Sequence, residues 1–314
     1  MSTLKIAWYN LENLFEPLQH PELKEEWTPE HYENKVKNLA SVISELHNPI
    51  GPDLLGICEV QSKSEEVIQD ILNELPNGNE YAIVHHRSED IREIDVGFIY
   101  RKSVLSDPKP VAYNVRKRYP TRDILVVTFQ VTNGSTLHVI GNHWPSRTGG
   151  QYESEPFRIM VAENCAWVVD QFYQSNAEAN IIVMGDFNDE PFNRSIQEYL
   201  FAIRNRARVQ ARKNSARSRP YLYNLTWSLM DETTPGTYYY SKNPAGWNML
   251  DQIMVSKGIL VGNNGLEVDE KSIKIFRPKR IKEGSKPKPY RKRKNKWVKG
   301  FSDHFPITAL IKIL

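Results

Sequence analysis

The chain has little of three features that would each restrict its function. It has only 2 cysteines in 314 residues, Cys58 and Cys165, too few for a disulfide framework. No apolar run approaches the roughly 20 residues that a membrane-spanning helix needs. Residues 1–10 lack a charged segment followed by an apolar one, so no secretory signal is visible. We therefore expect a cytoplasmic protein without a membrane span, although a trimmed secreted form would look the same.

Net charge is also small, at +3, but it is distributed unevenly along the chain. Residues 1–200 hold 17 Lys and Arg against 30 Asp and Glu, whereas residues 201–314 hold 24 against 8. Residues 203–219 contain seven basic residues and no acid, and residues 277–300 contain twelve basic residues and one acid. We interpret both segments as loop insertions. An acidic half followed by a basic one suggests metal-binding carboxylates that face cationic loops in contact with substrate.

The chain does contain a mixture of helix and strand patterns. Apolar residues at helical spacing predict helices over 28–47, 64–75 and 156–175. Asn133-Gly134 predicts a hairpin between strands 124–131 and 136–141. Further strands are predicted over residues 5–9, 53–58, 81–84, 96–100, 181–184, 250–255 and 306–310. Hairpins mixed with helical crossovers favour two packed sheets with helices outside, rather than a regular alternating parallel sheet.

Five short polar clusters accompany these apolar runs. They are Trp8-Tyr9-Asn10-Leu11-Glu12, Ile57-Cys58-Glu59, Gly141-Asn142-His143-Trp144, Gly185-Asp186-Phe187-Asn188 and Ser302-Asp303-His304. Hard divalent cations such as Mg²⁺ are held by one or two carboxylates. A carboxylate at the end of a buried strand is costly unless it is paired or bound to metal. Glu59 is therefore the best single ligand candidate, the alternative being an exposed residue at a strand end.

Two other clusters offer groups that could activate water or contact phosphate. Asp186 and Asn188 lie two residues apart and would point to the same side if the extended strand continues. Asp could then accept a proton or bind metal while Asn orients the water; the alternative is an ordinary turn, which both residue types favour. His143 could donate to a phosphate oxygen, although a histidine at a strand end is more often structural.

The last cluster pairs an acid with a histidine near the C-terminus. Asp303 could supply a second metal ligand, and His304 could contact the phosphate. An imidazole in that role needs an orienting carboxylate, for which Asp251 is a candidate. The alternative for Asp251 is a residue at the edge of a hairpin.

As an ordered set, these motifs resemble those of the endonuclease/exonuclease/phosphatase superfamily, which has the deoxyribonuclease-I-like fold. Two further stretches match, Asp95-Val96-Gly97-Phe98-Ile99-Tyr100-Arg101 and Leu250-Asp251-Gln252-Ile253. The resemblance covers nearly the whole chain and is specific for the superfamily but not for a substrate. It implies a four-layer α/β sandwich, two mixed β-sheets packed face to face with helices on the outside. Residues 1–314 would then form one domain that carries the two basic insertions.

The resemblance also implies a metal site. Glu59 would bind the main Mg²⁺ or Mn²⁺ ion. Asn10, Glu12 and Asp303 would complete the metal and phosphate environment. No obligate protein partner is evident from the sequence.

The same resemblance implies in-line attack by water on the phosphorus. Asp186 would act on the attacking water, which Asn188 would orient. Asp251 would hold His304 against the phosphate, and His143 would face the scissile phosphate or the leaving group.

The surroundings of these motifs bear on the substrate. Arg147, on a glycine-containing loop, and Arg158, near the start of a helix, could contact phosphate. Trp144 lies beside the first of the two histidines, and Trp297 lies among the cations of residues 277–300, where aromatic rings could stack on bases. The alternative for this basic segment is a solvated loop.

We therefore predict a divalent-metal-dependent phosphodiesterase, more specifically a nuclease acting on DNA or RNA. One alternative within the superfamily is a phosphatase or phospholipase-type enzyme on inositol phosphates or phospholipid head groups. A third hypothesis is a non-catalytic nucleic-acid-binding protein, which requires the loss of a metal or catalytic residue. None of the matched positions lacks its polar side chain.

Overall fold

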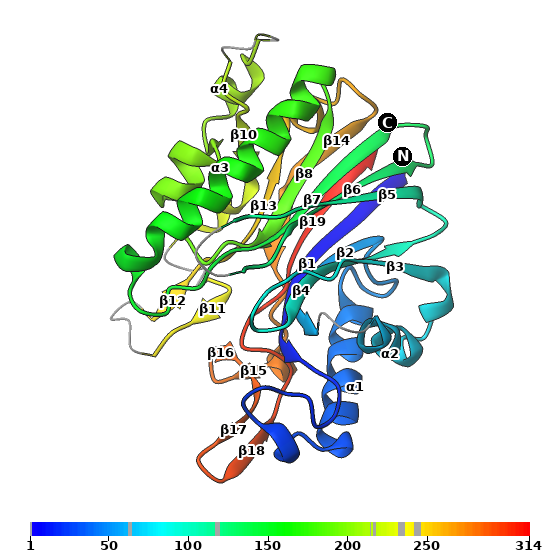
Figure 1. Ribbon diagram of the computed structural model, residues 1–314. Helices are drawn as coiled ribbons and strands as arrows, with labels where there is room; N and C mark the ends of the chain where they lie inside the picture. Colours follow the sequence, from blue (N-terminus) through cyan, green and yellow to red (C-terminus); the bar gives the residue numbers. More distant parts are fainter. Residues whose placement is uncertain are drawn as a thin grey trace.

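Two large sheets form the centre of the computed structural model (Figure 1), which describes residues 2–61, 65–116, 120–213, 215, 218–231, 236–241 and 246–314. The six-stranded sheet has the order β14-β19-β1-β2-β4-β3, with bounds Leu266–Ile275, Ile307–Ile313, Ser2–Leu14, Leu54–Gln61, Ile94–Arg101 and Tyr81–His85. The seven-stranded sheet has the order β5-β6-β7-β8-β13-β10-β9, with bounds Leu105–Tyr113, Ile124–Val131, Thr136–His143, Asn180–Asp186, Asp251–Val255, Leu222–Asn224 and Ala202–Ile203. Both sheets are mixed, because β1 runs parallel to β2 and β7 parallel to β8.

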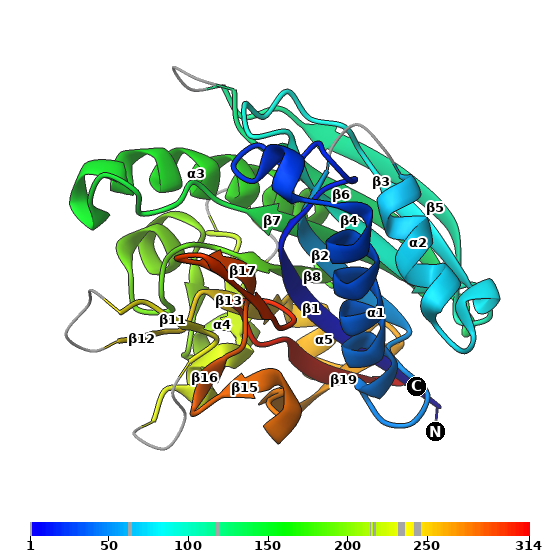
Figure 2. The same cartoon turned by 90° about the horizontal axis from the view of Figure 1, so that it is seen from below.

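Helices lie on the outer sides of the two sheets, as Figure 2 shows from below. They are α1 (Pro29–Glu45), α2 (Glu66–Glu74), α3 (Gln151–Ser175), α4 (Arg206–Gln210) and α5 (Lys257–Val261), with short turns at Lys24–Glu26, Gly78–Glu80, Ser195–Tyr199, Leu225–Leu229 and Lys279–Ile281. α1 buries Val36 and Leu39 in the core that contains the first sheet, and α3 buries Val161 and Val169 against the second. The predicted four-layer α/β sandwich is thus confirmed. Within the described residues, no helix is both long and apolar enough to cross a bilayer.

Two glycines allow the facing sheets to approach closely. A methyl group added to Gly56 would lie 2.4 Å from the Trp8 ring and 3.2 Å from the Met184 sulfur in the opposite sheet. One added to Gly141 would lie 2.7 Å from the Phe98 ring across the same interface. Large side chains of the same sheet (Trp8) and of the facing sheet (Phe98) therefore fill the space that these glycines leave open, as dense core packing requires.

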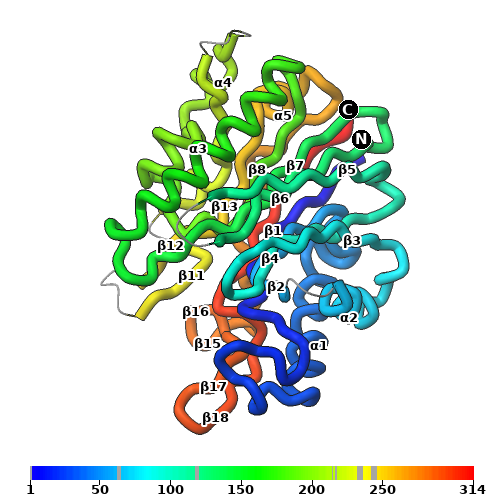
Figure 3. The backbone as a smooth tube through the Cα atoms, in the orientation of Figure 1, coloured from blue at the N-terminus to red at the C-terminus, as the bar shows by residue number. Residues whose placement is uncertain are grey.

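Strand register brings the polar clusters to one end of the sandwich. In the first sheet Asn10 pairs with Cys58, directly before Glu59, and in the second His143 and Asp251 both pair with Asp186. At the other end, Ser2 pairs with Ile313, so the chain termini lie side by side (Figure 3). Parallel neighbours such as β1–β2 and β7–β8 share the end at which they stop, which is why residues far apart in sequence meet there.

The predicted elements are present, and the differences have local causes. The Asn133-Gly134 hairpin is confirmed, with Gly134 at a φ of +83°. The helix predicted to begin at 156 begins at Gln151 instead, because the buried Arg158 donates to Gln151 O and to the Ser154 hydroxyl and so ties the preceding turn to the helix.

The interpretation of residues 277–300 as a loop is wrong. This segment forms two small hairpins, β15–β16 (Lys282–Glu283 with Lys286–Pro287) and β17–β18 (Tyr290–Arg293 with Lys296–Lys299). Tyr290 and Trp297 are cross-hairpin neighbours that pack against Trp27, and this packing orders a segment that its charge alone marks as solvated. A further short hairpin, β11–β12, joins Tyr238–Tyr239 to Trp247–Asn248. The described part of 203–219 contains only the ends of β9 and the short α4.

Candidate active site

Two β-bulges aim the carboxylates of the first sheet. The β1–β2 register shifts between Asn10 and Leu14, and the β2–β4 register shifts between Cys58 and Val60. At the bulges, Glu12 has a φ of 53° and Glu59 a φ of 60°. A non-glycine residue in this left-handed region costs on the order of 1 kcal/mol or more, and such strain collects at functional sites. Both carboxylate residues thus lie at bulges in the left-handed region, as residues at functional sites often do.

Side chains from both sheets converge on one carboxylate oxygen, Asp186 Oδ2. Asn10 donates to it from Nδ2 at 3.1 Å. His143 Nε2 lies 4.0 Å from it and 3.7 Å from Glu59 Oε1. His304 Nε2 lies 3.8 Å from the same oxygen. Five residues separated by up to almost 300 positions in the sequence thus surround one point at the end of the sandwich.

The two histidines of this centre are held in opposite protonation states. Burial lowers the pKa of His304, but the Asp251 carboxylate at 2.7 Å and the nearby Asp186 outweigh it and raise that pKa well above its usual value. Burial, with Arg122 and Arg92 nearby, lowers the pKa of His143 well below its usual value. A cationic and a neutral imidazole in one site can perform different proton-transfer roles.

The environment of Asp186 suits a group that exchanges protons near neutrality. Burial raises its pKa to about 6, opposed by His304 and reinforced by Asp251. The Asn188 backbone N–H donates to Asp186 Oδ1 at 3.0 Å, and the Asn188 side chain donates to Trp144 O at 2.9 Å. Asn188 is also in the left-handed region, at a φ of 49°. Its backbone and side chain therefore fix the orientation of this loop beside the carboxylate.

Glu12 and Asp303 lie beside cations that the protein itself supplies. Tyr290 N donates to Glu12 Oε2 at 2.6 Å, and Lys35 donates to Glu12 O. Arg291 Nε lies 3.4 Å from Glu12 Oε1, and its Nη2 lies 3.7 Å from Asp303 Oδ2. Burial, followed by repulsion from Asp303, raises the pKa of Glu12 to about 8. The negative charge of Glu12 and Asp303 is therefore partly offset by the cations of the protein itself.

Lys35 and Arg291 are part of the site's surroundings that sequence reasoning missed. Lys35 carried a detectable signal, because it lies on the same helical stripe as Tyr32 and Leu39, which are buried in α1. A lysine on a buried stripe needs a partner. Arg291 carried none, because it is one of twelve cations in a run and its partners lie up to 279 residues away.

The donor set fits a hard divalent cation. Asp186, Asp251 and His304 offer ligand atoms that all lie within 4.8 Å of one another, but Asp251 is already hydrogen-bonded to His304. Glu59 Oε2 accepts a hydrogen bond from Asn13 N at 3.0 Å, and the other carboxylate oxygen, Oε1, points toward the centre. Carboxylate and amide oxygens are the ligands that Mg²⁺ and Mn²⁺ prefer. Glu59, with Asp186 and Asn10 nearby, could therefore hold such an ion.

A cavity of about 630 Å³ opens over this centre. Its lining includes Glu59, His143, Asp186, Asn188, Asp303 and His304 together with Arg92, Arg147, Tyr238, Tyr240, Asn248 and Leu250. The Tyr238 ring lies 4.8 Å from the His304 ring, and Tyr240 is 45% exposed. Sequence reasoning missed this aromatic wall, although the run Tyr238-Tyr239-Tyr240 was a signal for it.

Three of the four residues predicted to bind substrate lie elsewhere. Trp144 is fully buried, packed on Phe187, and donates from Nε1 to Asn142. Arg158 is fully buried, with Nε 2.7 Å from Asp189 Oδ2. The substrate-binding roles predicted for both are wrong, because neither side chain reaches solvent. Their roles are structural.

Of the other two residues predicted to bind substrate, Trp297 lies away from the cavity and Arg147 lines it. Trp297 stacks on His31 at 3.7 Å between ring centroids and does not line the cavity, so its predicted role in stacking on substrate at the centre is not supported. Arg147 does line the cavity, but its guanidinium donates to Asn188 O at 2.7 Å and to Asn248 Oδ1 at 3.0 Å. It therefore holds the loop that carries Asn188 in place.

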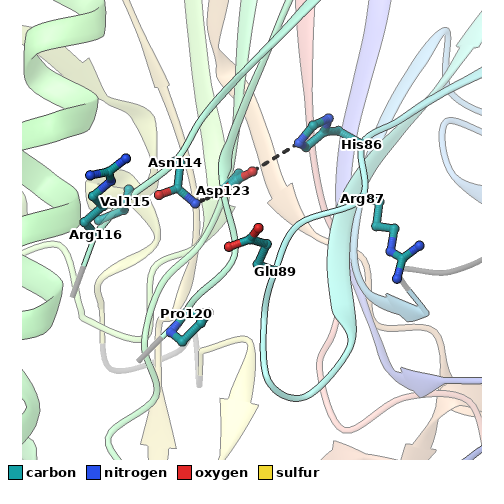
Figure 4. A pocket seen from close by; sticks show the side chains of 8 residues that line it. All are labelled: His86, Arg87, Glu89, Asn114, Val115, Arg116, Pro120 and Asp123. Carbon is teal, nitrogen blue, oxygen red and sulfur yellow. Dashed lines mark hydrogen bonds and ion pairs between the residues drawn. The ribbon is translucent and has the colours of Figure 1, made fainter. Parts of the chain in front are cut away.

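A second hollow, of about 600 Å³, lies between the loop after β3 and the connection from β5 to β6 (Figure 4). His86 Nε2 lies 3.1 Å from Asp123 Oδ2, and Asn114 donates to the other Asp123 oxygen at 3.1 Å. Burial raises the pKa of Asp123. This His–Asp pair resembles the His304–Asp251 pair. Among the described lining residues, Glu89 supplies one further carboxylate, and there is no second histidine.

Comparison with known proteins agrees with this fold. The sequence model of the Endonuclease/Exonuclease/phosphatase family matches residues 5–313. No curated protein matches the sequence. Among solved structures, humanized D. rerio TDP2 with 14 mutations aligns over 99% of both chains at 13% identity, with a TM-score of 0.62.

Two other solved structures are similar over the whole chain. D. rerio TDP2 complexed with single strand DNA product aligns over 99% of this chain and 100% of that chain at 13% identity, with a TM-score of 0.58. An endonuclease/exonuclease/phosphatase family protein from Bacteroides thetaiotaomicron aligns over 99% of this chain and 97% of that chain at 14% identity, with a TM-score of 0.59. At such identities the likeness is one of fold.

Proposed function

Because the chain belongs to the Endonuclease/Exonuclease/phosphatase family, we propose that it hydrolyses phosphodiester bonds in DNA or RNA with a divalent cation, Mg²⁺ or Mn²⁺, and that residues 1–314 act as one catalytic domain. The family generally cleaves phosphoesters and generally uses divalent metals. The observation that carries the proposal is the convergence of Asn10, Glu59, His143 and His304 around the Asp186 carboxylate.

Glu59 would be the main metal ligand, with Asn10, Glu12 and Asp303 completing the metal and phosphate environment. When bound, the cation would polarise a phosphoryl oxygen and offset the charge that develops there. Glu59 Oε1 faces the centre from a strained bulge, which supports this role. Glu12 and Asp303 both form ion pairs with Arg291, so their main contribution would be to the net charge around the metal.

Asp186 would take the proton of the attacking water. A pKa of about 6 leaves most of this carboxylate ionised at neutral pH and still able to hold a proton, as an efficient general base requires. Asn188, fixed by its bonds to Asp186 and Trp144, would orient that water. Attack would then occur in line with the leaving oxygen.

The two histidines would act on the phosphate from opposite protonation states. His304, kept cationic by Asp251, would donate to a non-bridging phosphoryl oxygen and stabilise its charge. His143, kept neutral by burial, would face the scissile phosphate or the leaving oxygen through Nε2. Its other nitrogen, Nδ1, has no hydrogen-bond partner among the described residues.

The walls of the cavity favour a nucleotide over a small head group. Tyr238 and Tyr240 offer ring faces beside the reacting centre, and a base can stack on such rings. Arg92, 40% exposed and 3.7 Å from Glu59, adds a cation near the phosphate position. A solved structure of similar fold contains a single strand DNA product, which supports nucleic acid as the substrate class.

A substrate panel tests the proposal. The protein is incubated with Mg²⁺ or Mn²⁺ and, separately, single-stranded DNA, duplex DNA, RNA, bis-p-nitrophenyl phosphate and an inositol phosphate, each with and without a chelator. We expect chelator-sensitive cleavage of a nucleic acid. Phosphate release from the inositol compound alone would assign the chain to phosphatases, and tight DNA binding with no turnover of any compound would make it a binding protein.

A further inference from the structure

The first basic segment lies at the end of the molecule opposite to the candidate active site. Arg206 in α4 donates to Leu260 O in α5, which begins directly after Ser256. The Ser256 hydroxyl bonds to Ala179 and Ile181 at the start of β8, whereas Asp186 ends that strand. A strand of this length spans about 20 Å. Figure 1 shows the same separation, with α4 at the top and β11–β12 and β17–β18 below.

Three arginines of this segment contact aromatic rings. The Arg208 guanidinium lies 4.6 Å from the Tyr221 ring centre, and that of Arg219 lies 5.1 Å from the Phe201 ring centre. Tyr221 and Phe201 are themselves in edge contact at 6.1 Å. A guanidinium, two rings and a second guanidinium thus lie side by side.

A third arginine makes the same kind of contact with a different ring. Arg204 lies 5.0 Å from the Trp227 ring centre. The side chains of Arg204, Arg208 and Arg219 are all exposed. We refer to these three arginines and the rings that they contact as the α4 surface.

Within the described parts of the chain, the three arginines of the α4 surface form no ion pair with an acid. The sequence contains no Asp or Glu from 199 to 230. The neighbouring Arg206 and Arg212 are paired with Glu270 and Asp170, but among the described residues no carboxylate lies within 4.0 Å of the three arginines of this surface. Stacking on rings fixes a guanidinium in place while leaving its N–H groups available to a phosphate.

We propose that the α4 surface binds the phosphate backbone of a nucleic-acid strand at a distance from the bond that is cleaved. The inference rests on the proposed function, since nucleic acid is the polyanion that such an active site would engage. Fixed guanidinium groups beside aromatic rings suit a strand that presents both phosphates and bases. Binding here adds affinity for long strands and leaves the chemistry unchanged.

The test compares two triple variants of the full chain under a chelator, so that binding is measured without cleavage. One is Arg204→Gln/Arg208→Gln/Arg219→Gln, in which glutamine keeps part of the stem on each ring. The matched control, Lys37→Gln/Lys102→Gln/Lys274→Gln, removes the same charge from exposed positions elsewhere. Affinity for oligonucleotides of increasing length is measured over a range of salt concentrations.

We expect the slope of log affinity against log salt to fall by about 2 in the α4 variant for single strands, as three lost phosphate contacts imply. The difference in affinity should be largest for strands longer than about six nucleotides, because these can span the roughly 20 Å between the α4 surface and the active site at about 3.4 Å per nucleotide. Hydrolysis of bis-p-nitrophenyl phosphate with Mg²⁺ or Mn²⁺ should be unchanged. Arg208→Gln alone should give about a third of the slope change, which guards against a folding defect of the triple variant.

An unchanged slope in the α4 variant, or an equal change in the control, would overturn the inference while leaving the proposed hydrolysis intact. Loss of binding to phosphatidylserine vesicles in place of nucleic acid would also overturn it, since the partner would then be a lipid surface. If the slope falls but the protein cleaves none of the nucleic acids, the binding surface stands and the proposed function fails.

Discussion

Several cations in the two cation-rich segments of this chain contact different groups, and this contrast separates two roles. In residues 277–300, Arg291 faces Glu12 and Asp303, while Lys292, Arg293 and Lys299 each pair with a glutamate. At the α4 surface the exposed arginines contact rings. The same residue types therefore set the charge of a site at one end of the molecule and remain available to a polyanion at the other. The number of cations in a segment does not reveal which role they have.

If the two ends have separate roles, catalysis depends only on the end that carries His304. His304→Ala tests this and should have the largest effect. Loss of the cationic imidazole should lower kcat on a nucleic-acid substrate by about 10²- to 10⁴-fold. His86→Ala is the matched control, because His86 also lies against an aspartate, Asp123, at 3.1 Å but away from the centre. Steady-state kinetics on both variants is the measurement. An equal decrease of kcat in both variants would show that the His304–Asp251 pair has no special part in the reaction.

Arg158 is a cation of a third kind, because it is fully buried and pairs with the buried Asp189. Arg158→Met removes the guanidinium beside the buried Asp189 and should lower the free energy of unfolding by about 3–5 kcal/mol. KM for nucleic acid should stay the same, because the side chain does not reach solvent. Urea unfolding and steady-state kinetics check both expectations. A raised KM in a variant of unchanged stability would restore the substrate-binding role predicted from the sequence.

The two ends should also respond differently to pH. Burial raises the pKa of Asp186 to about 6, and this carboxylate must be ionised to accept a proton from water. The rate should therefore rise with pH and level off above about 6, falling up to tenfold per pH unit below it; a bound cation would shift this limb to lower pH. Salt-dependent binding at the α4 surface should stay constant from pH 5 to 8, because guanidinium groups remain charged. Matching pH profiles for cleavage and for this binding would contradict the separation.

The smallest effect distinguishes two arginines of the same strand. Arg291 and Arg293 in β17 are 45% and 48% exposed, but only Arg291 lies beside Glu12 and Asp303. Arg291→Gln removes a competing cation and should tighten Mg²⁺ binding about three- to tenfold. Arg293→Gln should leave it unchanged. Isothermal titration gives both values, and weaker binding in the first variant, or equal shifts in both, would show that Arg291 does not compete with the metal.

The fold and the centre of the site were largely readable from the sequence, because each depends on local pattern. Apolar runs marked the strands, and polar clusters marked the point at which each strand ends, as for Asp186 after β8. Parallel pairing then required those ends to meet. The left-handed backbone at Glu12 and Glu59 could not be read, because bulges depend on register between strands distant in sequence.

Burial was the other property that the sequence did not reveal. Trp144 and Arg158 have residue types typical of substrate contacts, and only the packing of α3 and the loop after β8 places them inside. The partners of Arg291 lie 279 and 12 residues away, so its role depends on tertiary structure alone. Local chemistry can thus be predicted one motif at a time, whereas the partner that each cation finds is a property of the complete fold.

The metal centre at Glu59 is tested most directly by the affinity for Mn²⁺. Isothermal titration calorimetry measures this affinity for the wild-type chain and for Glu59→Gln. Substitution of an immediate ligand should weaken binding by at least about tenfold, with a folded protein by circular dichroism. Unchanged Mn²⁺ affinity in Glu59→Gln would contradict a metal centre at the end of the two sheets.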